Sequence, residues 1–412
     1  MGRKPATAQG LPLRYQRPYA VPLPFSAASV RLSALHAASF FSHGFYLPFF
    51  PIWLKSRDLD PAVIGIVVAI PIMVRILATA PLLSLADRSF GPRRLLLASH
   101  LGQMVVFPLL MFAQDSATII ALVALVAIAQ AAVIPGNDLV TTAAVQNDPR
   151  LHYGRLRGFG SISFFIANIV AGYLVGAFGA DIVLAALTVI PLLCMAATIS
   201  AVPAHGADLS ARGSAGAPAK GLPAVLWIVM IAAAMTQGTH GALNAFASIY
   251  WQSQGFADSV IGYFWAAGVI AEIVVFMVLG NAVGRGSGLG LIAIGAAAAV
   301  FRFTLMSFHP GAALTLGLQT LHSLTFGASH IGAMAALTAL APLHARGRAQ
   351  GIYGSLAALF TAASTIASGL IYKEAGAAVF AAMAPLGAIG LVLILVASRM
   401  LKAQPQRAGA GG

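Results

Sequence analysis

Long apolar runs alternate with short polar, glycine-containing or proline-containing segments along most of the chain. Each run is long enough for a helix to cross the roughly 30 Å hydrocarbon core of a bilayer, at about 1.5 Å of rise per residue. The pattern predicts an all-α membrane protein with about twelve membrane-spanning helices, at residues 32–54, 62–86, 95–113, 117–140, 158–178, 182–202, 222–250, 259–281, 288–308, 311–340, 350–371 and 376–398.

One stretch of this pattern occurs twice. Residues 42–75 align with residues 239–272 without a gap when the first stretch is shifted by 197 positions. Apolar, small and charged positions agree together over the whole stretch, and Arg75 falls opposite Glu272. The repeat predicts an internal duplication, with two six-helix pseudo-symmetric halves.

A segment rich in Ala, Gly, Ser and Pro separates the sixth and seventh runs. This composition is typical of a flexible linker. The predicted organisation is a cytosolic N-terminal arm, an N-terminal half, a cytosolic linker, a C-terminal half and a cytosolic tail, at residues 1–30, 31–202, 203–221, 222–400 and 401–412.

Composition supports the membrane and argues against nucleic acid as a partner. The 412 residues are 59% hydrophobic and 8% charged, against roughly 25% charged residues in an ordinary soluble domain. The net charge of +13 is spread in small groups between the apolar runs and forms no continuous basic stripe. With the N-terminus in the cytosol, only Lys55, Arg57 and Lys373 of the 24 basic residues fall outside, while Arg75 and Arg302 fall within runs. The positive-inside rule therefore predicts that both termini are cytosolic.

The loop between the second and third runs carries a recognisable motif. Residues 85–94 (LADRSFGPRR) resemble the loop motif of the major facilitator superfamily, with one extra residue and with Leu83 in place of the usual leading glycine. Two parallel six-helix halves are also the plan of that superfamily, whose substrate sites lie near the midplane between the halves. The resemblance implies a cytosolic gate that uses Asp87 and Arg88. The weaker second copy, residues 284–288, keeps an arginine and lacks the aspartate.

Four further segments resemble the phenylpropionate porter branch of this superfamily, at residues 45–55, 153–161, 248–272 and 321–334. The similarity extends from about residue 31 to residue 398. It implies a proton-coupled importer of aromatic monocarboxylates such as 3-phenylpropionate in the bacterial inner membrane. A monomer suffices, because the two halves supply each other's interface. Two alternatives stay open: efflux of aromatic or drug-like compounds or uptake of sugars or nucleosides on the same fold, and a non-transporting scaffold or receptor.

Several chemistries have no sequence signature here. Cys194, the single cysteine, lies inside an apolar run, and there is no paired metal-ligand motif, phosphate-binding glycine loop or nucleophile elbow. We therefore expect neither an enzyme nor a metal or cofactor site, and we expect a proton gradient to drive transport.

Arg75 and Glu272 are the strongest candidate site residues. Each lies at least twelve residues from either end of its apolar segment, which is roughly 18 Å or more along a helix. Ionisable groups at such depth cost roughly 2.5–3.5 kcal/mol on insertion scales and usually face a cavity or a partner. They are interpreted either as a static ion pair joining the halves, or as a carboxylate-binding cation and a proton-carrying acid. In the second case, protonation of Glu272 would free Arg75 for the substrate.

Other polar positions near mid-membrane are candidates for substrate contact. His43 and its repeat mate His240 can donate or accept a hydrogen bond or titrate near neutral pH, although either could simply tie two helices together. The tenth run places four residues at helical spacing on one face, which favours a cavity lining, namely Gln319, His322, Phe326 and His330.

A second polar position follows Pro135-Gly136, where a helix break is expected. Asn137 is a candidate for substrate contact and Asp138 for proton coupling, with a structural role as the alternative. Arg302 lies near the outer end of its run, so we expect it to snorkel and to be structural, with anion attraction as the alternative.

The aromatic residues of the duplicated segments divide into two groups. Trp53, Tyr250 and Trp251 are expected in the interfacial belt. Tyr263 or Trp265 could stack on an aromatic substrate.

Overall fold

The computed structural model describes residues 26–86, 90–203, 221–279 and 288–408, with side chains up to residue 403, and in these residues it is helical without strands. The N-terminal half contains α1 (Ala27–Lys55), α2 (Pro61–Ala86), α3 (Pro92–Met111), α4 (Ser116–Ala131), α5 (Val133–Asn147), α6 (Tyr153–Phe178) and α7 (Ile182–Ala201). The C-terminal half begins with α8 (Ala224–Gly238), α9 (Gly241–Ser253), α10 (Asp258–Leu279), α11 (Leu289–Met306) and α12 (Ala312–Thr320). It continues with the π-helix η2 (Ser323–Ala328), α13 (Ser329–Leu340), the 3₁₀ turn η3 (Leu343–Ala345), α14 (Arg346–Ala375), α15 (Ala378–Ala381) and α16 (Ala384–Ala408).

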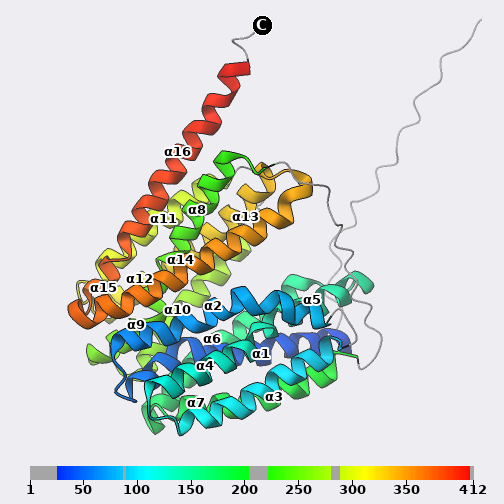
Figure 1. Cartoon of the computed structure of the whole chain (residues 1–412), viewed down its shortest axis with the longest axis vertical. Helices are drawn as coiled ribbons and strands as arrows, with labels where there is room; N and C mark the ends of the chain where they lie inside the picture. The colour runs from blue at the N-terminus through cyan, green and yellow to red at the C-terminus, as the bar shows by residue number, and fades with distance from the viewer. Residues whose placement is uncertain (1–25, 87–89, 204–220, 280–287, 409–412) are drawn as a thin grey trace, which may run out of the picture.

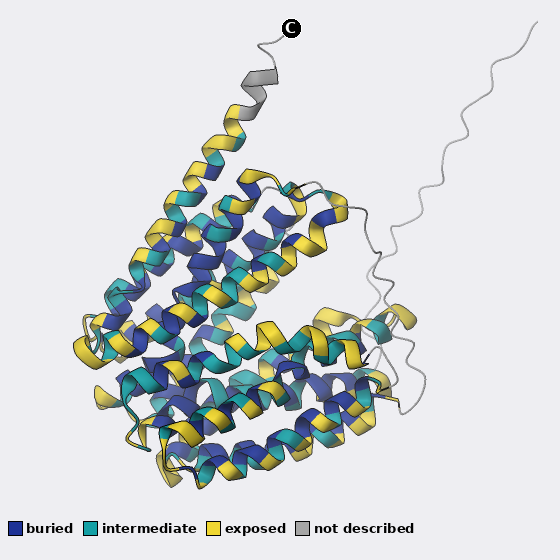
Figure 2. Ribbon diagram, viewed as in Figure 1, coloured by how far each residue is buried: buried dark blue, intermediate teal, exposed yellow. Residues whose placement is uncertain are grey.

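Among the described residues, eleven helical segments are long and apolar enough to cross a membrane. α1 has 29 residues but is not among them, because serines and histidines interrupt its apolar sequence. The all-helical, multi-pass prediction is confirmed, and the count of twelve stays a prediction. Exposed positions follow the outer faces of both bundles (Figure 2). The exposed large apolar residues, as lipid contact requires, include Phe112, Phe178, Leu193 and Met277.

The two halves form separate helix bundles that meet at one end and diverge at the other (Figure 1). Within the first half, α1 packs against α6 and α7; within the second, α8 packs against α14 and α16. The halves touch through α2 and α14, through α6 and α10, and through α1 and α9. They meet at the end where α1 stops and α2 starts, which is the predicted outer end.

Close backbone approach at this end depends on glycine. A Cβ atom on Gly65 of α2 would lie 2.9 Å from the carbonyl oxygen of Thr365 on α14, and one on Gly262 of α10 would lie 2.5 Å from that of Asn168 on α6. Both distances are shorter than a methyl group tolerates, so only glycine lets these helices cross here. Gly65 and Gly262 are 197 residues apart, as are Asn168 and Thr365. The internal repeat therefore has a matching spatial two-fold, and it extends beyond the aligned stretch to α6 and α14.

Two polar contacts cross between the halves at the same end. Lys373 Nζ lies 2.7 Å from Asp60 Oδ2, and the hydroxyls of Tyr173 and Tyr263 are 3.0 Å apart. The hydrogen bond from Lys373 lowers the pKa of the Asp60 carboxyl from its ordinary value. Asp60 therefore stays ionised at neutral pH, and the contact would be lost only under strongly acidic conditions.

The expected helix break lies close to Pro135 but earlier than predicted. α4 ends at Ala131 and α5 begins at Val133, so Pro135 is in the first turn of the new helix. Proline has no N–H to donate to the carbonyl four residues earlier, which is that of Ala131. The hydroxyl of Thr79 on α2 donates to this carbonyl instead, at 3.2 Å. A side chain on a neighbouring helix thus repairs the break.

The interfacial-belt prediction is wrong for three aromatic residues. Trp53, Tyr250 and Trp251 are 0%, 2% and 1% exposed. Trp53 donates to Asp181 Oδ1 at 3.1 Å, and Tyr250 donates to the carbonyl of Met306 at 3.2 Å. Hydropathy gives depth along a helix, but it does not give the face that a side chain occupies.

The predicted boundaries are only partly covered by the described residues. α1 begins at Ala27, inside the predicted arm, and α16 continues to Ala408, past the predicted end of the half at residue 400. The remainder of the arm, most of the linker, and the loop residues Asp87 and Arg88 lie outside the described residues.

Candidate functional site

A cavity of about 620 Å³ lies between the two halves. Its wall combines residues of α1, α2, α4 and α6 with residues of α8, α9, α10, α12, η2, α13 and α14. The structure brings seven predicted site residues to this wall: His43, Arg75, His240, Glu272, His322, Phe326 and His330. Gln319, the fourth member of the predicted face on the tenth run, also lines it.

His322 connects the acid of the cavity to a buried cation. Its Nε2 atom lies 3.5 Å from Glu272 Oε2, and its Nδ1 atom lies 3.4 Å from a terminal nitrogen of Arg302. A guanidinium can only donate hydrogen bonds, so Nδ1 must accept and the imidazole proton must reside on Nε2. The neutral ring therefore directs its N–H toward Glu272.

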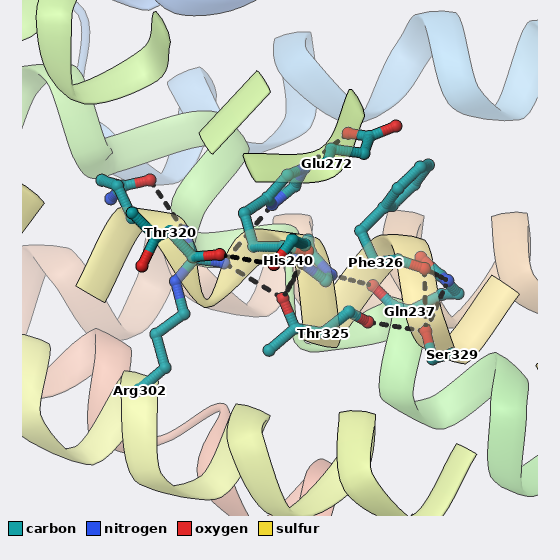
Figure 3. Close-up of polar contacts among 11 residues, drawn as sticks. Gln237, His240, Glu272, Arg302, Thr320, Thr325, Phe326 and Ser329 are labelled. Atoms are coloured by element: carbon teal, nitrogen blue, oxygen red, sulfur yellow. Dashed lines mark hydrogen bonds and ion pairs between the residues drawn. The ribbon is translucent and has the colours of Figure 1, made fainter. Parts of the chain in front are cut away.

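Arg302 differs from its prediction, because its side chain turns inward from α11 and does not snorkel (Figure 3). The residue is 0% exposed, and its guanidinium donates to Gln319 Oε1 at 2.7 Å and to Thr325 Oγ1 at 3.2 Å. Among the described residues no carboxylate lies within ion-pair distance of it. A buried cation held only by neutral groups is costly. We therefore interpret Arg302 as the centre of a hydrogen-bond network with Gln319, His322 and Thr325.

His240 extends the network toward α8. Its Nδ1 donates to the carbonyl of Gln237 at 3.0 Å, so its Nε2 accepts from the hydroxyl of Thr325, also at 3.0 Å. Thr325 in turn accepts from Arg302. His240 is thus a neutral hydrogen-bonding residue in this arrangement, and it lines the cavity as well.

The π-helix η2 explains how the residues of the tenth run come together. His322, Phe326 and His330 stack in a row with interplanar angles of 7° and centroid distances of 5.3 and 6.3 Å. A π-helical turn leaves backbone groups without their usual partners. The Gln237 amide donates to the carbonyl of Phe326 at 3.3 Å and to Ser329 Oγ at 3.0 Å (Figure 3). Because Gln237 is on α8, the irregular turn is held from a neighbouring helix.

Arg75 lines the cavity from the opposite half. Arg75 is exposed and lines the cavity, and no hydrogen bond or ion pair joins it to any of the described residues. The static Arg75–Glu272 ion pair is therefore absent from this arrangement, and Arg75 needs no release by protonation of Glu272. Its guanidinium is available to an anion that enters the cavity.

Sequence reasoning missed Arg157, which was counted only as a cytosolic basic residue. This side chain of α6 lines the cavity, with its guanidinium 3.8 Å from the centroid of the Phe40 ring and 3.7 Å from Asp138 Oδ1. One signal was available, because Arg157 lies within the segment 153–161 that carries part of the resemblance. The depth of Arg157 could not be read from its position, since α6 begins only four residues earlier, at Tyr153.

Asn137 and Asp138 are not part of the cavity wall. Asn137 is fully buried and donates to Ser39 Oγ at 2.9 Å, which joins α5 to α1. Asp138 accepts from the hydroxyl of Tyr153 at 2.9 Å and faces Arg157. The position favours the structural alternative for Asn137 and makes Asp138 a neighbour of a cavity arginine.

Of the two candidates for stacking on an aromatic substrate, Trp265 lines the cavity and Tyr263 does not. Trp265 lines the cavity, and its Nε1 donates to Ser248 Oγ at 2.9 Å. Tyr263 faces away and meets Tyr173 at the interface between the halves. Tyr46, an aromatic residue of the first duplicated segment, also lines the cavity. Lining residues that the sequence did not single out include Gln130, Gln237, Asn244 and Tyr353.

The cavity wall has an excess of positive charge. Among the described residues, Arg75 and Arg157 are the arginines that line it and Glu272 is the one lining carboxylate, while Asp138, behind the wall, lies 3.7 Å from Arg157. Such a chamber can stabilise one negative charge on a bound molecule.

Known proteins resemble this chain over most of its length. The MFS_1 like family matches residues 30–382. A protein of Escherichia coli (strain K12) named "Probable 3-phenylpropionic acid transporter" is 29% identical over 352 residues, which cover 84% of this chain and 91% of that protein.

Solved structures of low sequence identity share the fold. The nucleoside transporter NupG superposes with a TM-score of 0.73 at 16% identity, over 91% of this chain and 99% of that one. A bacterial homologue of the human lysosomal transporter Spinster, in an inward-facing and occupied conformation, gives 0.69 at 13% identity, over 92% and 97%. The human organic anion transporter TETRAN gives 0.62 at 14% identity, over 90% and 100%. The resemblance seen in the sequence is confirmed: this chain belongs to the MFS_1 like family and is a multi-pass transporter of the major facilitator type.

Proposed function

We propose that this chain takes up an aromatic monocarboxylate such as 3-phenylpropionate together with a proton, by alternating access. We place it in the bacterial inner membrane as a monomer with twelve crossings and both termini in the cytosol. The observation that carries this proposal is the charge of the cavity wall: Arg75 has no ionic partner among the described residues, and it faces a cavity that also holds Glu272. The name of the Escherichia coli relative supports the same substrate class.

The substrate carboxylate binds to Arg75 in this proposal. An arginine can hold a carboxylate through two parallel N–H donors, which gives direction as well as strength. Arg157 adds a second positive charge to the same chamber. The aromatic ring then lies in the apolar part of the cavity, where Phe326 and Trp265 supply ring surfaces.

Glu272 is the proposed proton carrier. Its carboxylate is partly buried, and its Oε2 lies 3.5 Å from Nε2 of His322. The empty wall carries two cations and one carboxylate. A bound monocarboxylate together with a proton on Glu272 leaves the net charge unchanged. Both forms that reorient would therefore meet the same electrostatic cost. This balance favours a stoichiometry of one proton to one substrate.

The arrangement of the two halves supports alternating access. In this structure the halves are packed at the end that contains Gly65 and Gly262 and separated at the other end (Figure 1). Rocking about the midplane would exchange these two arrangements. Asp87 and Arg88 keep their proposed role at the opposite, cytosolic gate.

Uptake into proteoliposomes tests the proposal. The purified protein is reconstituted, an inward proton gradient is imposed, and accumulation of labelled 3-phenylpropionate is measured with competing aromatic acids, nucleosides and sugars. We expect accumulation that collapses with a protonophore and is inhibited by aromatic monocarboxylates. Competition by nucleosides or sugars alone would assign the alternative substrates, efflux only would reverse the direction, and transport of none of them would favour the scaffold or receptor.

A further inference from the structure

A second cavity, of about 560 Å³, lies at the predicted cytosolic end of the N-terminal half. It is formed where α1 and α3 begin and where α5 and α7 end. It shares no lining residue with the transport cavity. The ends of these four helices place it at the level where lipid headgroups meet the protein.

Two arginines give this cavity its charge. Arg31, which is exposed, and Arg93, which is half-buried, both line it. Within the described part of the chain neither guanidinium has an ion pair, and no lining residue is acidic. Asn147 and Ser200 also line the cavity with polar side chains. The described wall of the cavity therefore offers donors and positive charge and contains no acidic side chain.

The remaining wall is apolar and continues to the lipid-facing surface. Leu32, Val140 and Val202 are buried and form part of one apolar cluster. Ile199 lies on the rim and is 51% exposed. A ligand with a phosphate at one end and hydrocarbon at the other would match both parts of this wall.

We propose that this cavity binds the headgroup phosphate of an anionic phospholipid. Arg31 and Arg93 hold the phosphate, and the first carbons of an acyl chain follow the apolar rim at Ile199. Basic pockets between helices on the cytosolic side suit such headgroups because positive charge and apolar surface meet there. The lipid would tie the starts of α1 and α3 to the ends of α5 and α7, independently of the substrate.

Native mass spectrometry of the full chain released from mixed micelles tests this. The number of phosphatidylglycerol molecules bound per protein is compared with the number of phosphatidylcholine molecules. The comparison is made for the unmodified protein, for Arg31→Gln, for Arg93→Gln and for the double variant. Each basic residue near an anionic surface contributes about fivefold in affinity, so the double variant should bind roughly 30-fold more weakly. Arg31→Lys with Arg93→Lys keeps the charge and should retain most of the binding.

Arg94→Gln is the matched control. Arg94 is exposed and adjacent to Arg93, but it does not line the cavity. An equal loss in this control would mean that surface charge alone attracts the lipid, and unchanged binding in the double variant would also overturn the proposal. Titration with inorganic phosphate separates the two sources of the phosphate group: saturable binding of free phosphate without lipid retention would assign the cavity to the free anion and overturn the lipid.

Discussion

The Nε2 atom of His322 lies 3.5 Å from Glu272 Oε2, and a terminal nitrogen of Arg302 lies 3.4 Å from the Nδ1 atom on the other side of the ring. Arg302 can only donate, so it fixes the proton of His322 on the nitrogen that faces the acid. Arg302 is on α11 and does not line the cavity, yet it sets the tautomer of the imidazole that faces Glu272. The neutral ring of His322 thus contacts the carboxyl of Glu272 on one side and the guanidinium of Arg302 on the other.

Replacing Glu272 by glutamine should uncouple proton movement from substrate binding. The amide is similar in size but does not gain or lose charge by protonation at physiological pH. We expect substrate exchange across the membrane to persist and accumulation driven by a pH gradient to be lost, as measured by counterflow and by gradient-driven uptake on the same vesicles. Full accumulation by Glu272→Gln would remove this residue from the coupling role.

Replacing Arg75 should weaken binding of the carboxylate. Hydrogen bonds to a charged group contribute about 1.5–3 kcal/mol, so Arg75→Ala should raise the dissociation constant by roughly 10-fold to 150-fold. Arg75→Lys should recover part of this, because the charge remains and the bidentate geometry does not. Calorimetry with 3-phenylpropionate measures the change, and Arg348→Ala, at an exposed arginine outside the cavity, is the control. Equal affinities for Arg75→Ala and the control would contradict the assignment.

Arg302 should matter for the state of His322 and for stability. Arg302→Met removes the donors to Gln319, Thr325 and His322, and each buried group left unpaired costs about 1–3 kcal/mol. We expect a lower unfolding temperature by tryptophan fluorescence and a change in the tautomer of His322 by nitrogen NMR. A stability gain with an unchanged tautomer would show that the cost of burying the cation exceeds the value of its contacts.

Transport should be electrically silent. If one proton accompanies one monocarboxylate, no net charge crosses the membrane in a cycle. A potassium diffusion potential set with valinomycin should then leave the initial rate nearly unchanged, whereas a pH gradient of the same magnitude should drive accumulation. A current carried on addition of substrate, recorded on a solid-supported membrane, would require a different stoichiometry.

Gly172 and Gly176 allow a matched test of the crossing between α6 and α10. A Cβ at Gly172 would lie 2.5 Å from the carbonyl oxygen of Asp258, whereas one at Gly176 would lie 3.8 Å from its nearest neighbour, an ordinary contact. Gly172→Ala should therefore separate the halves at this end, and Gly176→Ala should not. Spin labels across the two halves report the distance. The same distance distribution in both variants would mean that the helices adjust without opening.

The repeat read from the sequence predicted much of the fold. The 197-residue shift that matches Gly65 with Gly262 also relates Asn168 to Thr365, so one repeat spacing describes both crossings that the structure shows. Arg75 and Glu272 could be placed in the cavity because a charge so deep in an apolar helix needs a polar environment. Arg157 could not be found in this way, since it lies near the start of α6, where cytosolic basic residues are common.

The sequence by itself determined that the chain is a duplicated bundle of membrane helices, because hydropathy and repeat spacing depend only on the order of residues. Only the tertiary structure decided the partners within the bundle. Arg302 turned inward to His322, Trp53 and Trp251 entered the core, and Arg75 faced open space where an ion pair with Glu272 was expected. Depth in a membrane is a property of one helix, whereas the choice of neighbour depends on how several helices rotate and cross, and that is set by packing throughout the bundle.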